Sequence, residues 1–155
     1  MIQSGNSSNA YLHVLSDNGT ARITASVETA AGAPFVGVNA TAFEVKLVPS
    51  VWIFQTATYD LNRNSVGQVQ VSLSNLGDKS RQSYYLRPGV TASVGFTLTD
   101  SSVLSIRPNP VQVNSQTLGS TIISPLKAGE TTITINAVPG FSSDAELQTL
   151  KVKVE

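Results

Sequence analysis

The chain has 155 residues, and its ten basic and ten acidic side chains give a formal net charge of zero. A neutral chain offers no electrostatic surface for polyanions, so the composition argues against a nucleic-acid partner. The absence of cysteine excludes a disulfide framework, a thiolate nucleophile and a cysteine-ligated zinc site.

The sequence is rich in polar, uncharged residues and poor in charged ones. Charged residues make up 13% of the sequence, about half their usual share in globular proteins. Such surfaces are frequent on extracellular β-proteins. No run of about 18 apolar residues occurs, so we expect no membrane insertion. The first four residues lack the basic and apolar regions of a secretory leader, and we expect Met1 to begin an excised piece.

Short strands separated by turn-forming residues are expected along the whole chain. No window shows sustained helical spacing of apolar residues, and β-branched residues and turn formers are common. The expected strands lie at about 10–15, 20–28, 41–48, 51–58, 67–74, 82–86, 90–99, 103–107, 110–114, 120–124, 130–137 and 147–154. Strands at this regular spacing are typical of an antiparallel β-sandwich.

The stretch 90–113 shows the pattern most clearly. Apolar and polar residues alternate from Val90 to Leu98, which predicts a strand with one buried and one wet face. Such a face needs a second sheet to cover it. Pro108 and Pro110 cannot donate backbone hydrogen bonds, so the chain is expected to follow a sheet edge there.

An internal repeat indicates how the chain is divided. Three blocks of the first 48 residues, at 10–15, 19–25 and 43–47, match blocks at 120–124, 129–135 and 150–154 in spacing and alternation. The proline in Val48-Pro49-Ser50 marks the boundary between two units. We therefore expect a partial unit at 1–48, which corresponds to the last strands of a repeat, and a complete domain at 49–155.

The partial unit is too short to bury a two-sheet core by itself. It could pack on the complete domain, pair with strands of another chain, or be the tail of a domain whose front half was cut away.

The second unit resembles a bacterial immunoglobulin-like domain. The strings that carry the resemblance are Ser102-Val103-Leu104-Ser105-Ile106, Gly129-Glu130-Thr131-Thr132-Ile133-Thr134-Ile135 and Leu150-Lys151-Val152-Lys153-Val154. The resemblance covers 51–155 fully and 1–48 as a partial copy. It implies an all-β, immunoglobulin-like antiparallel β-sandwich with a partial second sandwich unit at the N-terminus. It also implies a tandem module of a large bacterial surface or secreted protein, such as an invasin- or intimin-like adhesin or a multidomain polysaccharide-acting enzyme. The family supplies no catalytic residue.

Catalysis is not expected from the residues either. The only histidine is His13, and no Gly-x-Ser-x-Gly nucleophile elbow occurs. Five aspartates adjoin turn-like sequence, where their side chains typically bond to their own backbone: Asp17, Asp60, Asp78, Asp100 and Asp144. The sequence therefore predicts a protein that is not an enzyme and that needs no cofactor.

The loop that begins at Asp60 is a candidate calcium site. Asp60, Asn62 and Asn64 place oxygen ligands at alternate loop positions, as in a calcium-binding loop. The glycine, Gly67, comes two places late, and Val71 stands where a bidentate glutamate is needed. A plain asparagine-rich hairpin turn is the alternative.

Aromatic residues suggest core positions and a weak glycan site. Trp52 and Phe54 share a strand face and are expected to fill the core. Tyr84 and Tyr85 are expected to point to opposite sides of a strand, so that one is exposed. Tyr59, Tyr84 and Tyr85 are the candidates for stacking on a sugar ring.

The sequence thus predicts a non-catalytic structural or adhesive module of an extracellular or cell-surface bacterial protein. It would act as a spacer or in protein–protein contacts, with neighbouring immunoglobulin-like domains of the parent chain as its partners and a host protein, a self protein or a polysaccharide as further candidates. Two alternatives remain open: a carbohydrate-binding accessory module, and a fibre or oligomer subunit that assembles by strand exchange.

Overall fold

The computed structural model describes residues 19–25 and 41–155. The chain divides into two compact units, Met1–Val48 and Pro49–Glu155. The expected strand at 10–15 and the end of the one at 20–28 lie outside the described residues.

In the first unit, the described residues form one antiparallel hairpin of β1 (Gly19–Ala25) and β2 (Thr41–Leu47). That this unit is the end of a repeat stays a prediction.

The second unit contains ten strands and, in its described residues, no helix. Its strands are β3 (Ser50–Phe54), β4 (Thr58–Leu61), β5 (Gly67–Asn75), β6 (Ala92–Val94), β7 (Phe96–Leu98), β8 (Leu104–Arg107), β9 (Val111–Val113), β10 (Gly119–Pro125), β11 (Gly129–Ile135) and β12 (Thr149–Val154). No helix able to cross a membrane occurs in 19–25 or 41–155.

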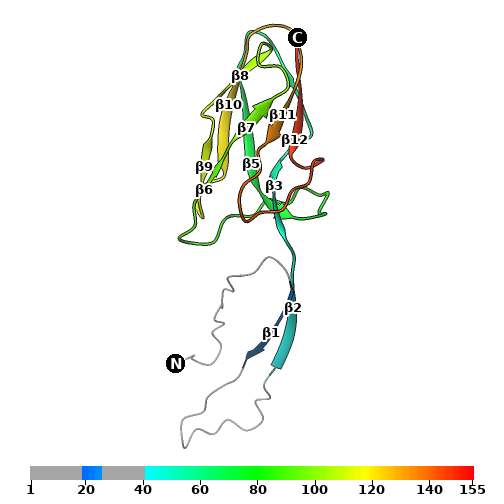
Figure 1. Ribbon diagram of the computed structural model, residues 1–155, viewed down its shortest axis with the longest axis vertical. Coiled ribbons are helices and arrows are strands. Elements are labelled where there is room, and N and C mark those ends of the chain that lie inside the picture. Colours follow the sequence, from blue (N-terminus) through cyan, green and yellow to red (C-terminus); the bar gives the residue numbers. More distant parts are fainter. Residues whose placement is uncertain (1–18, 26–40) are drawn as a thin grey trace, which may run out of the picture. The chain divides into compact units, whose positions relative to one another are not determined.

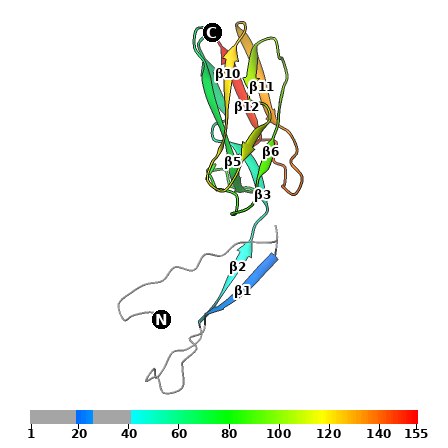
Figure 2. The same cartoon turned by 90° about the vertical axis from the view of Figure 1, so that its left-hand side faces the viewer.

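Two four-stranded sheets make up the sandwich of the second unit (Figures 1 and 2). The first has the order β3-β5-β10-β8 and the second β4-β12-β11-β7, while β6 and β9 form a separate pair. All neighbours are antiparallel except β4 and β12, which run parallel. β8 is an edge strand, and the two prolines follow it, so the expected passage along an edge is confirmed.

The core lies between the two sheets and is built by the alternation that the sequence shows. Trp52 and Phe54 are fully buried, as expected. Phe54 stacks on Phe96 of the opposite sheet with ring centroids 6.0 Å apart. Burying a side chain of this size stabilises the fold by about 1.5–3 kcal/mol.

β3 is buried on its second face as well. Val51 and Ile53 form a small apolar cluster with Leu147, which lies in the segment between β11 and β12. The same segment pairs with the outer edge of β3, because Ser142 N–H donates to Ser50 C=O at 2.9 Å. This segment therefore covers both the face and the edge of β3.

The single strand expected at 51–58 is wrong. The chain forms β3, crosses from one sheet to the other at 55–57, and then forms β4 in the second sheet. Residues 51–54 are all apolar and all buried, and β4 follows after only three residues, so periodicity alone did not reveal the crossing.

The prediction of a strand at 82–86 is also wrong. The only pairing in this segment is an isolated bridge between Tyr84 and Leu73. Arg81 has a positive φ of 55° and Gly89 one of 81°, and such residues interrupt extended backbone. Without a strand there is no alternation, and both Tyr84 and Tyr85 are exposed. The expectation that they point to opposite sides assumed a strand at 82–86, and no such strand forms.

The strand expected at 90–99 is split at Gly95. β6 pairs with β9, whereas β7 pairs with β11. Asn109 fills the resulting gap: its Oδ1 accepts from Phe96 N–H and its Nδ2 donates to Phe96 C=O, both at 2.9 Å. The side-chain amide thus replaces a strand partner for one residue.

Candidate functional site

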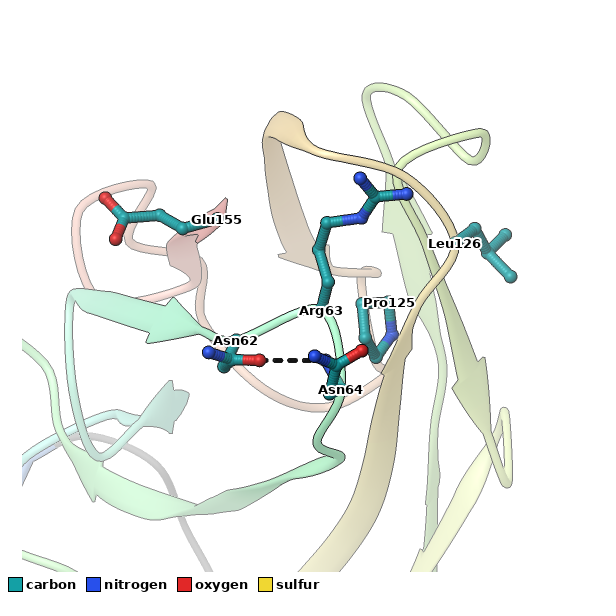
Figure 3. A pocket seen from close by; sticks show the side chains of 6 residues that line it. All are labelled: Asn62, Arg63, Asn64, Pro125, Leu126 and Glu155. Atoms are coloured by element: carbon teal, nitrogen blue, oxygen red, sulfur yellow. Dashed lines mark hydrogen bonds between the residues drawn. The ribbon is translucent and has the colours of Figure 1, made fainter.

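A polar depression of about 340 Å³ lies at the end of the sandwich where β4, β10 and β12 finish. Figure 3 shows the Arg63 side chain between Glu155 on one side and Pro125 and Leu126 on the other. The lining residues are Asn62, Arg63, Asn64, Pro125, Leu126 and Glu155.

The turn after β4 holds one wall of this depression by local hydrogen bonds. Asn62 Oδ1 accepts from Asn64 N–H at 2.9 Å, and the Asn62 carbonyl accepts from Ser65 N–H at 3.0 Å. This is the asparagine turn that the sequence offered as the plain interpretation. Arg63 N–H donates to Glu155 C=O at 2.9 Å, which fastens the turn to the end of β12.

The three calcium candidates do not line one depression. Asp60 lies on β4 opposite Lys153 and lines a separate hollow, whereas Asn62 and Asn64 line the depression at the tip. Within 19–25 and 41–155, no three carboxylate, histidine or cysteine side chains gather as metal ligands do. Calcium binding through Asp60, Asn62 and Asn64 stays a prediction.

The three tyrosines lie at two places. Tyr59 packs against the core, and a Cβ on Gly67 would come within 2.9 Å of its ring. Tyr84 bridges Leu73, which is six residues further along β5 than Gly67, or about 20 Å. A single platform of all three rings is therefore not formed, although Tyr84 and Tyr85 are 43% and 59% exposed.

The aspartates of the loops act on their own turns. Asp100 Oδ1 accepts from the Ser102 hydroxyl and from Ser102 N–H, and these hydrogen bonds lower the pKa of the Asp100 carboxyl. Asp78 has the same relation to Ser80, again with a lowered pKa. The sequence predicted this role. His13 lies outside the described residues.

An arginine clamp at the opposite end of the sandwich was not predicted. The Arg81 guanidinium donates to three backbone carbonyls, those of Phe54 at 2.6 Å, Glu146 at 3.2 Å and Leu147 at 3.4 Å. Nearby, Lys79 pairs with Glu146, and this hydrogen bond raises the pKa of the lysine. The clamp ties the 76–91 loop to β3 and to the segment before β12. No sequence pattern marks it.

The order of the strands defines the class of the protein. Read along the chain, the first sheet contains strands one, three, eight and six of the unit, with its second strand moved to the other sheet beside the last strand. This is the arrangement of an immunoglobulin-like sandwich, in which strands A, B, E and D face strands C, F and G. The predicted fold class is confirmed.

The comparison with solved structures gives neighbours of low sequence identity and low TM-score. Domains 4 and 5 of the S-layer protein SbsC have 16% sequence identity and a TM-score of 0.44, with 74% of this chain and 58% of that chain covered. The D00-D0 domain of intimin has 9% identity and a TM-score of 0.45, with 74% and 54% covered. The chain thus spans little more than half the length of these structures. No protein-family model and no curated protein matches the chain.

Proposed function

We propose that the second unit is a non-catalytic structural module of a larger cell-surface protein, in which it separates and orients its neighbours. The observation that carries this proposal is the position of its two ends. Ser50 begins β3 at one end of the sandwich, and Glu155 lies at the other end (Figure 1). Neighbours joined at these residues would be held apart by the length of the unit.

The dimensions and bracing of the unit suit a spacer. β5 has nine residues and so spans about 30 Å of the long direction. The end near Ser50 is braced by the Arg81 clamp and by the segment that covers β3, and the end near Glu155 by the Arg63–Glu155 backbone bond. Both connection points are thus fixed to the sandwich body.

An adhesive role through a polysaccharide is the second candidate. It is favoured by two neighbouring exposed rings, Tyr84 and Tyr85. Stacking of a sugar on these rings would make the module a carbohydrate-binding accessory. Retention on immobilised polysaccharide that is lost in Y84A/Y85A would support this candidate, whereas retention that is equal in both proteins would count against it.

The spacer proposal is tested by comparing 1–155 with 49–155 in solution. Light scattering after size exclusion gives the molar mass, and a thermal melt gives the stability. We expect both proteins to be monomers, with the same melting temperature for the second unit. If 1–155 forms larger assemblies while 49–155 stays monomeric, the module is an oligomer subunit that pairs through its first unit, and the spacer proposal is wrong.

A further inference from the structure

The hairpin of the first unit has the same register as the last hairpin of the second. β1 and β11 both have seven residues and both begin at a glycine with positive φ, 114° at Gly19 and 150° at Gly129. Each glycine lies opposite the last residue of the partner strand, Leu47 in β2 and Val154 in β12. Strand ends meet in any fully paired antiparallel hairpin, so the informative match is the glycine of positive φ that opens both hairpins.

The two hairpins also share the division into an apolar and a polar face. Because side chains alternate along strands, residues opposite each other in this register lie on one face. In β1 and β2 that face carries Ala21, Ile23, Phe43, Val45 and Leu47. In β11 and β12 it carries Thr131, Ile133, Leu150, Val152 and Val154. The other face of the first hairpin is polar, with Arg22 opposite Glu44 and Thr20 opposite Lys46.

The faces differ in what covers them. In the second unit all five residues are at most 5% exposed, because the sheet β3-β5-β10-β8 packs on them. In the first unit Phe43 is 49% exposed, and its four companions are only partly buried. Within 19–25 and 41–48 no second sheet is present to cover this face.

We propose that β1 and β2 are the closing hairpin of a further immunoglobulin-like sandwich. The occupant of their apolar face is the inner face of a sheet of the β3-β5-β10-β8 kind, carried by the same polypeptide ahead of β1. A sheet of this kind fits the face because one covers the matching face of β11 and β12. The observed register keeps Arg22 and Lys46 on the opposite face. This proposal does not depend on the spacer function.

The test supplies the missing strands. In the fusion protein, residues 49–128, which contain β3 to β10, replace residues 1–18 and are joined to Gly19. Residue-resolved hydrogen exchange is then measured for the amides of β1 and β2 in 1–155 and in the fusion. The amides of β11 and β12 in the same molecule serve as an internal standard.

We expect the hairpin amides to exchange at least about a thousandfold more slowly in the fusion than in 1–155, since exchange from a core strand requires global unfolding. I23D in the fusion should remove this protection and leave that of β11 and β12 unchanged. A second fusion, with 49–118 joined ahead of the whole of 1–155, leaves out β10 (Gly119–Pro125) and relies on residues 10–15, which match 120–124 in the sequence, to take its place.

Two results would overturn the proposal. One is hairpin exchange in both fusions that is as fast as in 1–155, while β11 and β12 remain protected. The other is hairpin protection in 1–155 that increases with protein concentration, because the apolar face would then be covered by a second copy of the chain.

Discussion

Gly119 is the residue whose replacement tests the packing of the core most directly. It lies in β10 opposite Val71 of β5. A Cβ at this position would come within 2.5 Å of Val71 Cγ2, 2.8 Å of Val113 Cγ2 and 2.9 Å of Val111 Cγ2. Valine has a stiff χ1, so these methyl groups cannot easily turn away. G119A therefore requires strands β5 and β9 to shift.

The expected cost follows from two opposing terms. Overpacking a core typically costs about 1–3 kcal/mol, and three simultaneous contacts place this site in the upper part of that range. Alanine regains about 0.5–1 kcal/mol because it has less backbone freedom than glycine in the unfolded chain. We expect G119A to lower the free energy of unfolding by about 2 kcal/mol. The melting temperature should then fall by about 8–16 °C for a domain of this size.

Urea denaturation followed by the fluorescence of the single, fully buried tryptophan, Trp52, measures this change. The outward-facing neighbour gives a matched control, S120A, for which we expect a change within about 0.5 kcal/mol. In G119A/V71A the shortest contact is removed, so the double variant should be more stable than the sum of the two single changes by about 1 kcal/mol. A neutral or stabilising G119A, or strict additivity with V71A, would refute the packing argument.

Three further substitutions test single interactions. N109A removes the side-chain partners of both Phe96 N–H and Phe96 C=O, and it should lower the free energy of unfolding, measured by urea denaturation, by about 1–2 kcal/mol. N109D should lie between N109A and the wild type because it keeps the acceptor. R81M should lower the free energy of unfolding by about 1.5–3 kcal/mol, since three carbonyls lose a charged donor. R81K should restore little of this loss. Wild-type stability in R81M would show that the clamp is dispensable. S102A should raise the pKa of Asp100 toward its ordinary value of 3.8, as followed by NMR titration of the carboxyl. A lowered pKa gives stability that is fully present above the ordinary value and is lost as the pH falls through the lowered one, so S102A should weaken the protein above about pH 4 and progressively less at lower pH.

Alternation was enough to predict the class of the fold and most of the core. Trp52 and Phe54 were placed correctly because residues two positions apart lie on the same face of a strand, so the two rings could be assigned to the core together. The same signal could not show that 51–58 changes sheets, since residues 51–54 are a continuous apolar run and β4 follows after only three residues. It could not show the break at Gly95 either, because that break depends on Asn109, a residue 14 positions further along the chain.

The candidate sites were less predictable because they rest on loops. The asparagine turn after Leu61 was readable, since its hydrogen bonds join residues two and three positions apart. Its attachment to Glu155 was not, since that bond joins distant parts of the chain. For the same reason the Arg81 clamp, whose acceptors include Leu147, left no local pattern to find.

The parallel pairing of β4 with β12 has a mechanical consequence. Lys151 N–H donates to Ala57 C=O at one end of the pair, and Glu155 N–H donates to Leu61 C=O at the other. Tension between the two ends that reaches β4 through β3 would slide β4 and β12 along each other and load their hydrogen bonds together. Such shear requires the bonds to break together, whereas peeling would break them one after another. The parallel β4–β12 pair would therefore resist stretching along the strand direction more than a pair that peels apart.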